Sequence, residues 1–302
     1  MVSLTYFQHR ASNNMNNQRS QKFIDQALKK VIPVFEFLFK CKVTGVDQMK
    51  QDQQYICIAN HNIGVLIEGF TLLNAWQKYF KPEHLCFAMA HRFFFLFPVV
   101  KYVMSRLGCI PANHDSADEI LQAGHSMLVF PGGNYECIRT YFDREQCDFN
   151  QRKGWVKIAL KYNLDIVPIA ITGSHSVNPV FYRSQFLSYL LILPKLFHIK
   201  WFPISLAQVT YSVIAFFIFK LFLPLWLVCV ISYFVYLFAF LIPILPAKIR
   251  MNINTPVRLS ELNKTGQPLA DVINSPEFLQ ICYDHVSQII QQNMDQMNRQ
   301  PN

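Results

Sequence analysis

One histidine and one acid in the first third of the chain could form a catalytic pair. In IANHNIGVLIEG, residues 58–69, His61 follows an apolar run, and Glu68 is the nearest acid. A histidine titrates near neutrality and is the commonest general base. The apolar run is predicted to be a buried strand, and active sites of α/β proteins lie at the ends of such strands. The placement favours a catalytic role for His61, although a lone histidine is more often structural.

A glycine turn is the second candidate. VFPGGNYECIR, residues 129–139, carries an apolar run into Pro-Gly-Gly. Glycines let backbone N–H groups approach a ligand closely, and such groups can hold a phosphate or an oxyanion. Glu136 and Arg139 follow at helical spacing and could orient a polar group. An ordinary strand-to-helix turn would explain the glycines alone, so the prediction of a binding loop depends on the histidine motif.

Strand-like and helical stretches alternate along the chain around these candidates. QYICIANHN, SMLVFPGG and LDIVPIAITGS are predicted to be strands, with helices such as IEGFTLLNAWQKYF and GWVKIALKYN between them. SADEILQAG is predicted to be a helix with Ser116 as its N-cap. Several strands are apolar throughout, which is typical of a parallel sheet covered on both faces. The pattern predicts an α/β domain with a mostly parallel sheet flanked by helices.

The composition indicates membrane contact. The 302 residues are 52% hydrophobic and only 16% charged, with a mean hydropathy of +0.16, whereas soluble domains are about a quarter charged. The formal net charge of +9 suits anionic lipid headgroups. The competing interpretation, nucleic-acid binding, lacks a long Lys/Arg block. Eight cysteines without a C-x-x-C pair predict free thiols in a reducing compartment.

Several segments are predicted along the chain. Residues 1–21 are polar and asparagine-rich and lack the apolar core of a signal peptide, so we expect a mobile tail and a cytoplasmic soluble part. Residues 22–41 are predicted to form an amphipathic helix that lies at a membrane interface or packs on the core. The main domain, residues 42–302, is interrupted by a hydrophobic insertion at residues 201–247.

The insertion contains two stretches without a charged residue, 201–219 and 221–246. A spanning helix needs about 20 apolar residues, so the second stretch is long enough and the first is marginal. We therefore expect a membrane-embedded insertion with a transmembrane helix, arranged as a hairpin that turns near Lys220 or as one re-entrant element. The alternative, a buried core helix, would not need so much uninterrupted length.

Five motifs occur in an order that resembles the glycerolipid acyltransferase superfamily, of the lysophosphatidate acyltransferase kind. They are YICIANHN before a helix, GCIPA…ADEILQAG, VFPGGNYECIR, RKGWVKIALKYNLDIVPIAITGSH and KIRMNINTPVRLSEL. FPGG followed by an acid is closer to the diacylglycerol acyltransferase-like branch than to members with Pro-Glu-Gly. The resemblance covers residues 42–196 and resumes at residue 248. It implies a glycerol-phosphate acyltransferase-like α/β fold for residues 42–302.

The resemblance also implies an activity. The family transfers an acyl group from a thioester, on coenzyme A or acyl carrier protein, to a hydroxyl of a glycerolipid, without a covalent enzyme intermediate. His61 would take the proton from the acceptor hydroxyl. No metal or resident cofactor is implied, and the partners would be membrane lipids and the acyl carrier. The other implied site residues are Pro131, Gly132, Gly133, Glu136 and Arg139 for the acceptor, and Val167 and Pro168 for the acyl-donor pocket.

The first motif departs from the family pattern, in which an aspartate stands five residues after the histidine. That position is Leu66 here. On one continuous helix Glu68 would be separated from His61 by about 10 Å of rise, too far for a hydrogen bond. We expect Gly64 to permit a loop that brings Glu68 back as a catalytic partner. Otherwise a backbone carbonyl or another carboxylate would orient His61.

The second motif also departs, because Asn113 and His114 stand where the family often has a phosphate-binding arginine. This favours a neutral acceptor, such as mono- or diacylglycerol, over lysophosphatidate. Two further hypotheses stay open: a catalytically silent lipid-binding or scaffold member, and an acyltransferase for a lipid-linked glycan. The aromatic run at residues 93–97 could line the acyl entrance or could be core or membrane-facing surface. We expect a membrane location with the catalytic domain on the cytoplasmic side.

Overall fold

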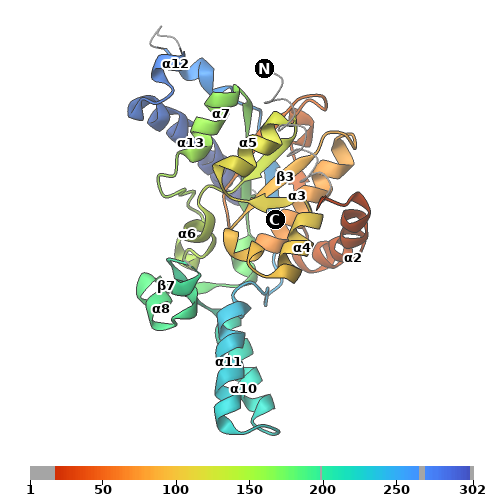
Figure 1. The fold of residues 1–302 in the computed structure, drawn as a ribbon, viewed down its shortest axis with the longest axis vertical. Helices are drawn as coiled ribbons and strands as arrows, with labels where there is room; N and C mark the ends of the chain where they lie inside the picture. The colour runs from red at the N-terminus through yellow and green to blue at the C-terminus, as the bar shows by residue number, and fades with distance from the viewer. Residues whose placement is uncertain (1–17, 198, 265–268, 300–302) are drawn as a thin grey trace, which may run out of the picture.

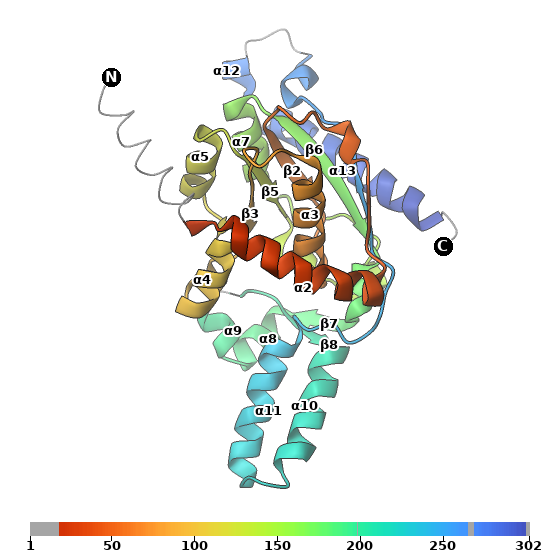
Figure 2. The same cartoon turned by 90° about the vertical axis from the view of Figure 1, so that its right-hand side faces the viewer.

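The computed structural model describes residues 18–197, 199–264 and 269–299 (Figure 1). A seven-stranded sheet with the order β1-β9-β6-β2-β5-β3-β4 forms its centre. All neighbours in this sheet pair in parallel except β6 and β9. The prediction of a mostly parallel sheet flanked by helices is confirmed (Figure 2). Its strands are β1 (Lys42–Thr44), β2 (Tyr55–Ala59), β3 (Cys86–Ala90), β4 (Cys109–Pro111), β5 (Ser126–Val129), β6 (Asp165–Thr172) and β9 (Arg250–Ile253).

Side chains that alternate along the strands build one core on each face of the sheet. On β2, Ile56 and Ile58 face a cluster that includes helices α5, α7 and α13, while Tyr55 and Cys57 face the cluster that includes α3. The bounds of the helices are α2 (Gln21–Phe39), α3 (Val65–Tyr79), α4 (Pro98–Arg106), α5 (His114–Gln122), α6 (Gly133–Cys137), α7 (Gly154–Tyr162), α8 (Gln185–Leu190), α9 (Leu193–Leu196), α10 (Leu206–Phe219), α11 (Leu225–Ala239), α12 (Leu269–Val272) and α13 (Pro276–Arg299).

Smaller elements complete the fold. Strands β7 (Val180–Ser184) and β8 (Phe202–Ser205) pair antiparallel in a separate two-stranded sheet. Short 3-10 helices connect other elements: η1 (Val46–Gln48), η2 (Arg92–Phe95), η3 (Tyr141–Asp143), η4 (Ser174–Val177) and η5 (Leu259–Leu262).

Helix α2 both packs on the domain and exposes apolar side chains. Its Ile24, Leu28 and Ile32 are buried, and Phe70 and Leu73 of α3 pack against them. On the same helix Phe37 is 81% exposed. The helix therefore has a core-facing side and a separate apolar surface. The tail predicted at residues 1–21 lies almost entirely outside the described residues.

The hydrophobic insertion forms a hairpin of two helices that projects away from the sheet, at the bottom of both views (Figures 1 and 2). Helix α10 has 14 residues and α11 has 15, and the chain turns between Lys220 and Pro224. No helix among the described residues combines the length and apolar character needed to cross a membrane, so the predicted transmembrane helix is not found there. The long apolar run is divided because Pro224, which has no N–H to donate, stands where α11 begins.

Candidate active site

His61 and Glu68 meet at the carboxyl end of β2. The strand ends at Ala59 and α3 begins at Val65, so the intervening loop separates His61 from the helix that carries Glu68. The Nδ1 atom of His61 lies 3.2 Å from Oε2 of Glu68. The exposed fractions are 8% for His61 and 0% for Glu68. Although the two residues are seven positions apart, their side chains are in direct contact. The loop that contains Gly64 makes this contact possible, as predicted.

Gly64 serves this loop by allowing close packing. Its φ of −75° is open to any residue, but a Cβ there would lie 3.0 Å from Cβ of Ser174. Ser174 follows β6, and its hydroxyl donates a hydrogen bond to Oε1 of Glu68. The absence of a side chain at Gly64 therefore lets the loop after β6 approach the His61–Glu68 pair.

The Glu68 carboxylate is held from several sides. Asn62 donates from its side-chain Nδ2 to Oε1 at 2.9 Å and from its backbone N–H to Oε2 at 3.4 Å. Ser174 supplies the further donor to Oε1. With Glu68 accepting from the Nδ1–H of His61, the lone pair of the ring is on Nε2. That tautomer is the one a general base needs.

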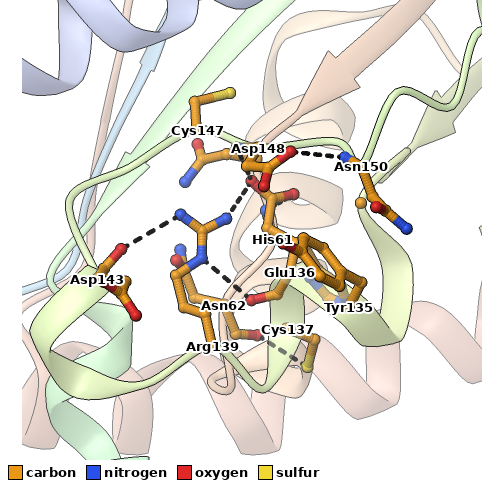
Figure 3. Close-up of polar contacts among 12 residues, drawn as sticks. His61, Asn62, Tyr135, Glu136, Cys137, Arg139, Asp143, Cys147, Asp148 and Asn150 are labelled. Atoms are coloured by element: carbon orange, nitrogen blue, oxygen red, sulfur yellow. Dashed lines mark hydrogen bonds and ion pairs between the residues drawn. The ribbon is translucent and has the colours of Figure 1, made fainter. Parts of the chain in front are cut away.

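A second buried carboxylate supports the backbone of His61 (Figure 3). Glu136 accepts from the N–H of His61 at 3.0 Å and from the N–H of Asp148 at 3.3 Å. Its Oε1 also lies 2.5 Å from Nη2 of Arg139. Burial raises the pKa of Glu136 to about 7, against the opposing effect of the Arg139 guanidinium. Glu136 and Arg139, predicted to bind the acceptor, instead lie buried behind His61.

The Pro-Gly-Gly turn depends on close packing and on one arginine. A Cβ at Gly132 would lie 2.3 Å from Cβ of Glu136, and Gly133 has a φ of +47°. Arg152 donates from Nη1 to the carbonyls of Pro131 and Gly132, at 3.1 and 3.0 Å. The role of Arg152 was not predicted from the sequence, because its partners lie 20 and 21 residues earlier. The only signal in the sequence was its place at the start of the RKGW motif.

A large apolar cavity of about 860 Å³ lies beside His61. Pro131 and Gly133 line it together with His61, whereas Gly132, Glu136 and Arg139 do not. Val167 and Pro168, predicted for the acyl-donor pocket, do not line it either. Val167 is 0% exposed in the core, and Ile169 lines the cavity instead. The lining also includes Phe93 and Phe94 of the aromatic run, Asn113 and His114, and Phe238 and Leu241 near the end of the hairpin.

The surroundings of His61 change its pKa. Burial lowers the pKa, but Cys137 and Glu68 outweigh this and raise it above the ordinary value for histidine. The Sγ of Cys137 donates to the carbonyl oxygen of Asn62 at 3.4 Å. Glu68 is in direct contact with the His61 ring, at 3.2 Å. The upward direction makes His61 a stronger base than a free imidazole.

The cysteines form neither disulfides nor a metal site. All eight are free thiols, as predicted. In the described part of the chain, no three His, Cys, Asp or Glu side chains gather closely enough to hold a metal ion.

Part of the chain is similar to known proteins. Residues 40–172 match the family model Acyltransferase, and this range includes His61, Glu68 and the Pro-Gly-Gly turn. An uncharacterized protein of Mycobacterium leprae is 30% identical over 173 residues, which cover 57% of this chain and 45% of that protein. Human 2-acylglycerol O-acyltransferase 3 is 24% identical over 173 residues, 54% of this chain and 49% of that protein. The chain thus spans about half the length of these curated relatives.

A solved structure has the same fold. The crystal structure of the 1-acyl-sn-glycerophosphate acyltransferase PlsC from Thermotoga maritima matches with a TM-score of 0.51 and 15% identity. The match covers 92% of this chain and 81% of that one. Residues 40–172 thus match the Acyltransferase family, and the chain is similar to glycerolipid acyltransferases in sequence and in fold.

Proposed function

We propose that this protein is an O-acyltransferase that moves a fatty acyl group from an acyl thioester to a hydroxyl of a glycerolipid, with His61 as the general base. The donor would be acyl-coenzyme A or acyl carrier protein. One observation carries the proposal: a buried His61–Glu68 contact of 3.2 Å lies beside an apolar cavity of about 860 Å³. The pair can activate a hydroxyl, and the cavity can hold an acyl chain.

The reaction would need no covalent enzyme intermediate. Nε2 of His61 takes the proton of the acceptor hydroxyl while its oxygen attacks the thioester carbonyl. The carbon–sulfur bond then breaks, and the imidazolium returns the proton to the departing thiolate. Glu68 keeps the ring in the required tautomer and stabilises the imidazolium. Glu136 holds the backbone N–H of His61 in place.

We propose a neutral acceptor, mono- or diacylglycerol. Asn113 and His114 line the cavity where the family often has an arginine for phosphate. The name of the human relative, 2-acylglycerol O-acyltransferase 3, designates a neutral glyceride as the acceptor of that protein. These two observations point to the same class of hydroxyl.

We also propose that the α10–α11 hairpin enters one leaflet of a membrane and that the catalytic domain lies on its cytoplasmic side. Three apolar side chains at the hairpin tip are highly exposed: Leu221 at 76%, Phe222 at 77% and Trp226 at 68%. Phe238 and Leu241, near the other end of α11, line the cavity beside His61. A lipid could therefore pass from the bilayer to the active site along the hairpin.

The test is acyl transfer by detergent-solubilised protein. Labelled acyl-coenzyme A and acyl carrier protein would be offered with lysophosphatidate, lysophospholipids, monoacylglycerol, diacylglycerol and a lipid-linked glycan. We expect transfer to a neutral glyceride, and a loss of at least about 100-fold in His61→Ala but not in the control His84→Ala. Absence of transfer from folded protein with either carrier would contradict the proposal and favour a silent lipid-binding member.

A further inference from the structure

A second, smaller pocket lies at the end of β6, close to the catalytic pair. Its volume is about 320 Å³, and unlike the apolar cavity it is lined largely by polar and charged side chains. Thr172 and His175 belong to its wall, as do Lys248, two residues before β9, and Arg250, the first residue of β9. The segment from Thr172 to His175 also contacts the His61–Glu68 pair, because the hydroxyl of Ser174 donates a hydrogen bond to Glu68.

Three buried polar atoms in this wall have no hydrogen-bond partner: Oγ1 of Thr172 and both ring nitrogens of His175. The exposed fractions are 5% for Thr172 and 3% for His175. Buried polar groups in folded proteins are nearly always paired, and leaving one unpaired costs free energy. Two such residues that line one pocket therefore indicate a polar ligand.

Positive charge converges on the same pocket. Thr172 lies directly opposite Arg250 in the β6–β9 ladder, so the two side chains project on the same face of the sheet. Side chains alternate between the two faces of extended backbone, and Ile249 between the two cations is buried. Lys248 therefore projects on the same face as Arg250. Neither Lys248 nor Arg250 forms an ion pair with any residue that the structure describes. Arg144 and Glu145 also line the pocket, and they form an ion pair with each other, with Nη2 of Arg144 3.3 Å from Oε1 of Glu145.

One glycine brings these groups together. Gly173 has a φ of +86°, and a Cβ there would lie 2.0 Å from the carbonyl oxygen of Lys248. Only a residue without a side chain lets the backbone after β6 approach the backbone before β9 so closely. This packing brings Lys248 and Arg250 beside the unpaired groups of Thr172 and His175.

We propose that this pocket binds a phosphate group. The cations supply charge, and the Thr172 hydroxyl and a neutral His175 ring each supply one donor, as phosphate oxygens require. His175 follows Ser174, the partner of Glu68, so the bound phosphate would belong to a molecule whose reacting part lies at His61. That last assignment rests on the proposed acyl transfer, and either the thioester donor or a phosphorylated acceptor could carry the phosphate.

The binding of phosphate can be tested without any catalysis. Calorimetric titration with inorganic phosphate, at constant ionic strength in chloride, should show saturable binding to the full-length protein. The double variant Lys248→Gln/Arg250→Gln should bind about tenfold more weakly or worse, because contacts to a charged group are lost. Lys157→Gln, which removes an exposed lysine on α7, should bind like the wild type.

Thr172→Val provides the sharpest variant because it keeps the shape and removes only the unpaired hydroxyl. The variant should fold at least as well as the wild type, since a buried hydroxyl without a partner is costly, yet it should bind phosphate severalfold more weakly. A wild type that binds phosphate no better than chloride, or a double variant that binds as tightly as the wild type, would overturn the proposal and indicate a water-filled pocket.

Substrate kinetics then identify the source of the phosphate. A KM that rises in the double variant for acyl-coenzyme A but not for the 3′-dephosphorylated donor assigns the pocket to the donor. A KM that rises for lysophosphatidate but not for monoacylglycerol assigns it to the acceptor. If phosphate binds but no acyl transfer is found, the pocket stands and the proposed function fails, so the two failures are distinguishable.

Discussion

At the scale of single residues, the site is built from two buried carboxylates with different partners. Glu68 contacts the ring of His61, and Glu136 holds its backbone N–H. His61 and Glu68 could be predicted from the sequence because both lie in one short stretch whose glycine permits a loop. The contacts of Ser174 and Arg152 could not, because each reaches a partner that is distant in sequence and adjacent only after β2, β5 and β6 pair.

The ion pair of Glu136 and Arg139 should be important for stability. Both side chains are almost completely buried, at 0% and 3% exposure. Arg139→Met leaves Glu136 without its cation, and such losses typically cost about 3–5 kcal/mol of the free energy of unfolding. The measurement is denaturant unfolding of the variant. Adding Glu136→Gln should recover part of the loss, and two additive losses would contradict a direct pair.

At the scale of elements, the turn between β5 and α6 requires a glycine at one position. A Cβ at Gly132 would lie 2.3 Å from Cβ of Glu136. We expect Gly132→Ala to lower the free energy of unfolding by about 1–3 kcal/mol through overpacking, and to reduce activity by displacing Glu136 from His61. Chemical denaturation of the purified variant measures the stability, and initial transfer rates measure the activity.

Gly69 provides the matched control. It lies within α3, and a Cβ there would meet no atom within 4 Å. Gly69→Ala should therefore raise the free energy of unfolding by about 0.5–1 kcal/mol, because alanine favours helix. If the Gly132→Ala protein were as stable as the Gly69→Ala protein, the turn would accommodate a Cβ at position 132, and the predicted overlap with Glu136 would be wrong.

Helices and strands were predictable where the apolar pattern was long. Their exact ends were not, because neighbouring residues of similar capping ability compete for the same position. The helix predicted with Ser116 as N-cap begins earlier, because Asn113 accepts the hydrogen bond from the N–H of Ser116 at 2.8 Å. Asparagine and serine are similarly good caps, so the sequence alone does not choose between them. The antiparallel β6–β9 pair was likewise hidden, because β9 follows a long insertion that conceals the direction of its return.

At the scale of the whole molecule, exposed apolar surface at the hairpin should control membrane binding. We expect the wild type to float with anionic liposomes and the variant Phe222→Glu/Trp226→Glu to float much less, because charges at the tip oppose insertion. Ile281→Glu is the control: Ile281 is 52% exposed on α13, at the opposite end of the molecule in Figure 1. Equal flotation of all three proteins would contradict insertion by the hairpin.

The hairpin shows what the apolar pattern could and could not predict. A hairpin that turns near Lys220 was one of the two arrangements predicted, but the lengths of its helices, 14 and 15 residues, were not evident from composition. Hydropathy reports the solvent that a segment prefers, whereas the length of each helix depends on where the chain turns. The apolar character and the turn near Lys220 were therefore predicted, whereas the transmembrane helix expected in the insertion is not found among the described residues.

The most direct test of the central claim, that His61 is a base oriented by Glu68, is the pH dependence of kcat/KM. His61 must be neutral to accept a proton, and its neighbours raise its pKa. The rate should therefore increase with pH, with a midpoint above the ordinary histidine value of about 6.5. Glu68→Gln removes a negative charge, so its midpoint should move to lower pH and its maximal rate should fall. A Glu68→Gln profile with the wild-type midpoint would contradict a catalytic His61–Glu68 pair.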